Sequence, residues 1–99
     1  MRLSILDDLD VLQDGTATQR TQWIHEQKDQ ELYQVGSWLF MNLGANTQNY
    51  DHKRTNVRDI LECYYYHRQW SPKQKHLVGH AIIEYWSLRA VENDPRYAF

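Results

Sequence analysis

The chain has 99 residues, of which 41% are hydrophobic, 24% are charged and 13% are aromatic, and its formal net charge is -2. This length suits one domain with one hydrophobic core, and the composition excludes a collagen-like chain, a membrane-spanning protein and a fully disordered chain. Because Cys63 is the only cysteine and the first eight residues contain no apolar signal segment, we expect a cytoplasmic protein without an intrachain disulfide.

The first helix is predicted over residues 5–13. Ser4 is the expected N-cap, and the acidic Asp7 and Asp8 suit the positive end of the helix dipole. Gly15 favours the end of the helix just before it. The apolar stripe that should face the core consists of Ile5, Leu6, Leu9 and Leu12.

The second predicted helix is the longest and covers residues 18–43, with either Thr16 or Thr18 as its N-cap. Gly36 indicates either a close helix crossing or a break into two shorter helices. The turns at 38–41 are apolar on every side, which indicates complete burial or cover by a partner. The inward stripe consists of Leu32, Val35, Leu39 and Leu43.

The second half of the chain predicts a helical hairpin. Residues 45–54 show no periodicity and are the expected loop, and a helix follows over 56–68. The residues of a capping box at 71–74 begin another helix, which runs to about residue 92 and is followed by a short tail over 94–99. Because the connection between these two helices is short, they should be antiparallel. The whole chain is therefore predicted to be one all-α domain, a small bundle of about four helices.

Four metal-ligating side chains lie at i, i+4 spacing on the two helices of this hairpin. Cys63 and His67 lie on the first helix, and His76 and His80 lie on the second. In an antiparallel hairpin, His67 comes near the level of His76, and Cys63 near that of His80. Zinc accepts such a Cys/His set and would stabilise a small domain. The alternative is that Cys63 is a small buried side chain and that the histidines at the helix ends are solvated.

Charge is distributed unevenly along the chain. Residues 1–51 carry 3 basic and 8 acidic side chains, whereas residues 52–99 carry 8 basic and 5 acidic ones. Basic side chains interleaved with aromatic ones can follow a phosphate backbone and stack on bases. A nucleic-acid-associated module is therefore one alternative, with a basic set of Lys53, Arg54, Arg58, Lys73 and Lys75. The slightly acidic balance of the whole chain favours the other interpretation, a solvated loop with ordinary charged flanks.

Aromatic residues surround the predicted hairpin turn. Tyr64, Tyr65 and Tyr66 are consecutive, and helical steps of about 100° spread them around the helix, so at least one must meet solvent or a partner. Trp70 lies at the expected tip of the hairpin, where burial is difficult. Tyr, Trp and Arg are enriched at the centres of protein interfaces. These features predict a surface that binds a different protein or a second copy of the chain, formed by Tyr65, Tyr66, Arg68 and Trp70.

The stretch from Val57 to Gln74, with its run of three tyrosines and its helix start Ser71-Pro72-Lys73-Gln74, resembles a hairpin that recurs in small proteins of phages and mobile elements. In those proteins a helix with a Tyr-rich end precedes a helix that begins with a similar Ser-x-Lys-Gln pattern. The resemblance implies no catalytic activity. It implies a phage or plasmid origin, for which a short helical protein that binds and inhibits a host enzyme or defence complex is typical.

No residue pattern typical of an enzyme is present in the sequence. It contains no nucleophile elbow, P-loop, dinucleotide-binding glycine motif or Cys-His-Asn pattern. We therefore predict a small non-enzymatic protein that acts by stoichiometric binding to another macromolecule, without a cofactor unless the Cys/His set holds zinc.

Overall fold

The computed structural model describes residues 3–41, 51–88 and 94–97, with the backbone alone for 51–56 and 97. In these ranges the chain forms five α-helices and one short 3-10 helix, which confirms the all-α prediction. The elements are α1 (Ser4–Leu12), α2 (Ala17–Glu26), α3 (Asp29–Met41), α4 (Asp51–His67), α5 (Pro72–Trp86) and the 3-10 helix η3 (Pro95–Tyr97). Among these helices, none combines the length and the apolar character that crossing a membrane requires.

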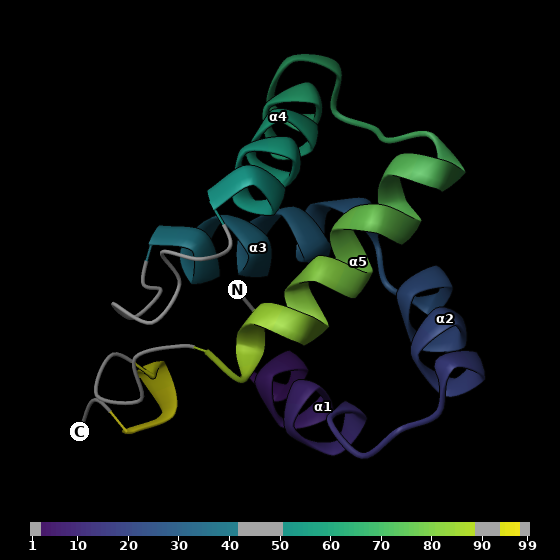
Figure 1. Ribbon diagram of the computed structural model, residues 1–99, viewed down its shortest axis with the longest axis vertical. Coiled ribbons are helices and arrows are strands. Elements are labelled where there is room, and N and C mark those ends of the chain that lie inside the picture. The colour runs from purple at the N-terminus through teal and green to yellow at the C-terminus, as the bar shows by residue number, and fades with distance from the viewer. Residues whose placement is uncertain (1–2, 42–50, 89–93, 98–99) are drawn as a thin grey trace.

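Helix α5 is the central element of the fold. Figure 1 shows α5 passing diagonally in front of α3, with α1 below it, α2 beside it and α4 above it. It packs against each of these four helices, and α3 also packs against α4. The buried apolar side chains form one continuous core as a result. The buried residues that α5 contributes to this core are Val78, Ile82, Ile83, Tyr85 and Trp86.

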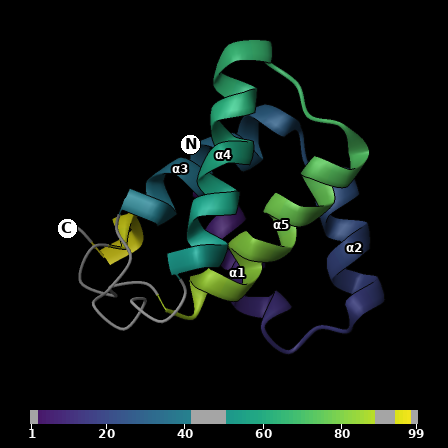
Figure 2. The same cartoon turned by 45° about the horizontal axis from the view of Figure 1, so that its top comes forward.

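Helices α4 and α5 form the predicted hairpin. Figure 2 shows α4 rising to its last turn and α5 running back in the opposite direction, at a slant to α4. The capping box at the start of α5 is confirmed, because the Ser71 hydroxyl accepts from the Gln74 N–H at 3.2 Å and the Gln74 side chain accepts from the Ser71 N–H at 3.0 Å. Two boundaries were predicted wrongly: α4 already begins at Asp51, inside the expected loop, and α5 ends at Trp86.

Helix α1 has no side-chain cap at its start, and Arg20 binds the carbonyls at its end. The prediction of Ser4 as N-cap is wrong, because Leu3 occupies that position and makes no side-chain capping bond. The predicted apolar stripe of α1 is confirmed as buried. At the other end, Arg20 of α2 donates from Nε to the Leu12 carbonyl at 2.9 Å and from NH2 to the Gln13 carbonyl at 3.0 Å. Arg20 therefore satisfies carbonyls that the end of a helix leaves without partners.

A break at Gln27 divides the predicted long helix into α2 and α3, so the expectations of one helix over 18–43 and of a break at Gly36 are both wrong. The backbone of Gln27 is extended, and its carbonyl accepts from Nζ of Lys75 at 2.6 Å. Lys75 also forms an ion pair at 3.2 Å with Asp29, the first residue of α3. Because Lys75 belongs to α5, a tertiary contact stabilises a break at a place where the sequence has neither Gly nor Pro.

The apolar end of α3 packs against α5 but is only partly covered by it. The rings of Trp38 and Trp86 lie 6.3 Å apart, and those of Phe40 and Tyr85 lie 5.1 Å apart. Met41, in contrast, is 84% exposed. Within this segment only Leu39 is buried, whereas Trp38 and Phe40 are half-buried, so the prediction of complete burial is wrong, and cover by a partner stays a prediction.

Two glycines lie where helices approach each other closely. A Cβ atom at Gly36 would lie 3.1 Å from Leu61 and 3.3 Å from Ile82, so Gly36 marks a close crossing, which was one of its two predicted roles. A Cβ atom at Gly79 would lie 2.6–2.8 Å from three side-chain carbons of Ile24. Ile24 is fully buried, so it has little room to move away. The absence of a side chain at Gly79 therefore allows α2 and α5 to pack at this distance.

We expect Gly79→Ala to lower the free energy of unfolding by about 1–2 kcal/mol, because overpacking in a filled core costs more than the helix propensity gained by replacing Gly. Urea unfolding of the purified variant measures this change. In the Gly79→Ala/Ile24→Ala double variant, the combined loss should be smaller than the sum of the two single losses, because the clash is gone. A Gly79→Ala protein as stable as the wild type would contradict this account of the α2–α5 contact.

Candidate functional site

The three consecutive tyrosines of α4 divide between the core and the surface. Tyr64 is buried and packs with Tyr33 at a ring distance of 4.7 Å and with Trp70 at 5.2 Å. Tyr65 and Tyr66 are 58% and 75% exposed, and their rings meet edge to face at 5.3 Å. The predicted division of the tyrosine run is therefore confirmed, with two rings on the outside.

Arg68 completes this exposed group. Its guanidinium carbon lies 5.8 Å from the centre of the Tyr65 ring, a cation–π arrangement. Its N–H donates to the Tyr64 carbonyl at 2.7 Å just after the end of α4, and its φ of 60° is left-handed. That conformation costs a residue with a side chain about 1–2 kcal/mol and is usually occupied by glycine at helix ends. We call Tyr65, Tyr66 and Arg68 the α4 aromatic surface.

Trp70 does not belong to this surface, so its predicted role as a partner contact is wrong. The side chain is only 7% exposed. Its indole N–H donates to the Ile60 carbonyl at 2.7 Å, and its backbone N–H donates to Oδ2 of Asp29 at 3.1 Å. Trp70 lies in the short connection between α4 and α5, and its ring packs against Tyr64 in the core. Trp70 is buried although it lies next to a turn, because its ring packs in the core and both of its N–H groups donate to acceptors within the fold.

The basic set of the nucleic-acid alternative is only partly on the surface. Lys75 is committed to the contact between α5 and the break before α3, with its side chain 17% exposed, so its assignment as a phosphate contact is wrong. Arg58 on α4 and Lys73 at the start of α5 are exposed. The side chains of Lys53 and Arg54 lie outside the described residues. With Trp70 also buried, the structure gives this segment no stacking tryptophan beside its charges.

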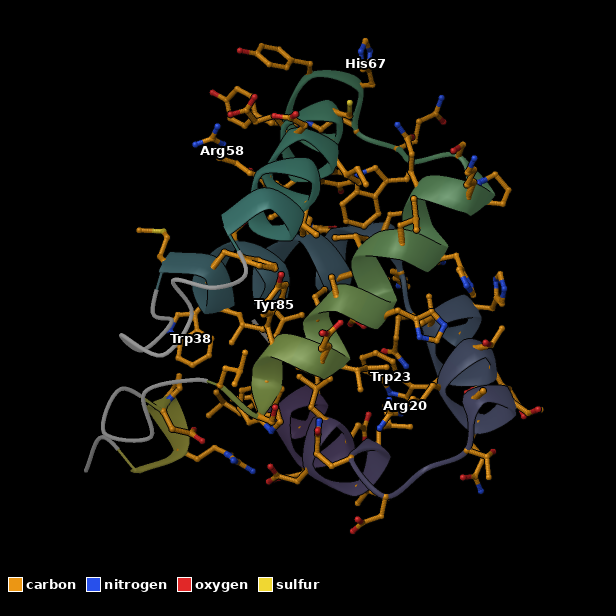
Figure 3. All side chains as sticks on the ribbon, in the orientation of Figure 1. Arg20, Trp23, Trp38, Arg58, His67 and Tyr85 are labelled. Carbon is orange, nitrogen blue, oxygen red and sulfur yellow. The ribbon has the colours of Figure 1, made fainter. Side chains whose placement is uncertain are left out.

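The four predicted metal ligands are not brought together. Figure 3 shows His67 at the end of α4 pointing away from the body of the molecule, and its side chain is exposed. Cys63 is half-buried and packs against the core. His76 and His80 meet each other, with ring centres 4.3 Å apart. Within the described ranges, no group of three or more His, Cys, Asp or Glu side chains has an arrangement that could hold a metal ion.

His80 lies where α5 contacts α2. Its Nε2 is 3.5 Å from the hydroxyl oxygen of Thr21. Burial lowers the pKa of His80, and the neighbouring His76 and Arg20 lower that pKa further because a second positive charge there is repelled. The folded protein therefore favours the neutral imidazole of His80 near neutral pH.

The acidic residues of α1 have structural roles that the sequence did not reveal. Oδ2 of Asp8 accepts from the indole N–H of Trp23 at 3.1 Å, and Oδ1 of Asp10 accepts from that of Trp86 at 2.7 Å. The available signal was the presence of four tryptophans, since a buried indole N–H needs an acceptor. Nothing in the sequence indicates which of the 13 acidic residues accepts from each indole N–H.

Arg96 of η3 ties the end of the described chain to α1. It makes a two-pronged contact with the fully buried Asp94, in which NH2 lies 2.7 Å from Oδ2 and Nε lies 3.1 Å from Oδ1. NH1 donates to Asp7 at 2.8 Å and to Asp10 at 2.7 Å, and the guanidinium lies over the Trp86 ring. These hydrogen bonds, led by the one to Asp94, raise the pKa of Arg96. The predicted tail is thus an ordered part of the fold at 94–97.

Other large apolar side chains that face solvent are scattered over the described surface. Leu3 and Val11 lie at α1, Met41 ends α3, and Leu77 lies on α5. Single exposed apolar residues of this kind are normal and need no functional explanation. The two tyrosines differ, because they are adjacent, contact each other and carry a cation beside them.

Comparison of the chain with protein-family models, with curated proteins and with solved structures gives no match.

Proposed function

We propose that this chain is a small non-enzymatic protein-binding module whose α4 aromatic surface docks onto a partner protein. The exposure of Tyr65 and Tyr66 is the observation that carries this proposal. The core is already filled on this side by Tyr64 and Trp70, so neither exposed ring is needed to complete it. Tyrosine offers a large apolar face, a polar tip and few rotatable bonds, which suits it to binding at a low entropic cost.

The backbone of Arg68 supports the same proposal. A glycine at this position would end α4 without strain, yet the chain has an arginine there. Residues other than glycine in left-handed backbone conformations are concentrated at functional sites. The strained position sets the Arg68 guanidinium beside the Tyr65 ring, where the two can recognise a partner together.

The chemistry of the surface indicates the kind of partner. Two amphipathic rings and a guanidinium fit a shallow apolar groove bordered by carboxylates, because arginine pairs with carboxylates through two parallel hydrogen bonds. The resemblance of the hairpin to small phage proteins suggests a host enzyme or defence complex as the partner, which the bound module would inhibit. A second copy of the chain is the alternative partner.

A photo-cross-linking experiment tests the proposal. Tyr66 is replaced by p-benzoylphenylalanine, which has a similar ring, and the protein is irradiated in cells of its natural source. The matched control carries the same group at Val11, which is 74% exposed on α1. We expect a discrete cross-linked product from position 66 that mass spectrometry identifies, and none from position 11.

Competition and product mass decide between the outcomes. Excess wild-type protein should suppress the product from position 66, whereas excess Tyr65→Ala/Tyr66→Ala protein should not. A product with the mass of two chains would assign the same surface to self-association. No product from position 66, or identical products from both positions, would overturn the proposed docking surface.

A further inference from the structure

His76 and His80 are two metal-ligating side chains that contact each other. They lie one helical turn apart on α5, so their side chains share a face. Their ring centres are 4.3 Å apart and the rings are inclined at 62°. Two imidazoles at this separation can each direct a nitrogen to one ion at about 2.0–2.1 Å with small side-chain rotations.

The histidine pair is partly open to solvent and lies beside α2, from which Arg20 repels a positive charge at His80, so two metal–nitrogen bonds have to outweigh that repulsion. Both histidines are only half-buried, so water reaches them. On the α2 side, Thr21 lies 3.5 Å from Nε2 of His80 and also lines a shallow open hollow together with Ala17, Thr18 and Gln22. Two imidazoles fill only two positions around an ion, and water that reaches the half-buried pair can fill the others.

We propose that His76 and His80 form a two-histidine site for a divalent transition-metal ion of the nickel, copper and zinc class. Imidazole nitrogens suit these ions, whereas magnesium and calcium prefer oxygen ligands. The site joins two ligands from one helix at the α2–α5 contact and requires neither Cys63 nor His67. It differs in this from the four-ligand set that the sequence suggested, and it is independent of the α4 aromatic surface.

Titration with Ni²⁺ by calorimetry at pH 7.5 tests the site, because imidazole nitrogens suit nickel. We expect one ion per wild-type chain. When one imidazole has bound the ion, the second binds it at a high effective concentration. His76→Ala and His80→Ala each remove this advantage and should each weaken nickel binding by about 100-fold. His25→Ala and His67→Ala are the matched controls, since both histidines are exposed, and they should bind as the wild type does.

A second measurement keeps the test valid if an alanine variant folds poorly. His76→Gln and His80→Gln retain a polar side chain, and saturating Ni²⁺ should raise the unfolding temperature of the wild type but not of these variants. Wild-type affinity in a folded His80→Gln protein would overturn the proposal. Loss of nickel binding in His67→Ala alone would overturn it as well, because the ion would then lie at the end of α4.

Discussion

Replacing Trp70 by Ala is expected to lower the free energy of unfolding by about 3–5 kcal/mol, the usual cost of truncating a large buried aromatic residue. The ring is 7% exposed and packs on Tyr64, and its N–H donates to the Ile60 carbonyl. Its removal opens a cavity between α4 and the start of α5. Urea unfolding monitored by circular dichroism measures the loss.

Two further variants separate this role from a surface role. Trp70→Phe keeps most of the ring but loses the hydrogen bond, so its stability should lie between those of Trp70→Ala and the wild type. Tyr66→Ala removes a ring of similar size from the surface and should change stability by less than about 0.5 kcal/mol. If Trp70→Ala proved as stable as Tyr66→Ala, the burial described here would be wrong.

Removing the guanidinium of Arg96 should produce the second large effect. In Arg96→Met the fully buried carboxylate of Asp94 loses the guanidinium but keeps the hydrogen bond from the backbone N–H of residue 96, so the loss should stay below that of a fully broken buried pair, which is about 3–5 kcal/mol. If η3 detaches from α1, Asp94 returns to water and the penalty for its burial disappears. The stability lost in Arg96→Met therefore cannot exceed the free energy that holds η3 against the rest of the fold. We therefore expect a lower unfolding temperature together with faster digestion by carboxypeptidase.

A double variant identifies the cause of this loss. Arg96→Met/Asp94→Asn also removes the buried negative charge that has lost its guanidinium, so it should recover part of the stability lost in Arg96→Met. Arg68→Met, which removes an exposed arginine, serves as the control and should stay within about 0.5 kcal/mol of the wild type. A loss in the double variant equal to that in Arg96→Met would show that the buried carboxylate is not the cause.

These two predictions concern the parts of the chain that support the proposed surface. Trp70 lies in the connection between α4 and α5 and packs against Tyr64, the residue before the exposed Tyr65 and Tyr66. Variants at Trp70 should therefore weaken partner binding only as far as they unfold the hairpin, whereas the tyrosine variants should weaken it in a folded protein. Measuring stability and binding on the same variants separates the two effects.

The candidate site could be predicted in part. Helical geometry alone requires that three consecutive tyrosines cannot all enter the core, and the two that face solvent are two of the four predicted partner contacts. Trp70 was misassigned because its position next to a turn says nothing about the acceptor that Ile60 provides. The pairing of His76 with His80 follows from their spacing, but the separation of Cys63 and His67 from them depends on how α4 slants across α5.

Local interactions explain what the sequence determined by itself. The capping box at Ser71 and the apolar stripe of α1 depend on residues within four positions of one another, so their residue types and spacing predict them. The tertiary structure decided the break at Gln27, the burial of Trp70 and the docking of Arg96. These depend on partners 48, 41 and 89 positions away, respectively, and only the packing of four helices around α5 brings such residues into contact.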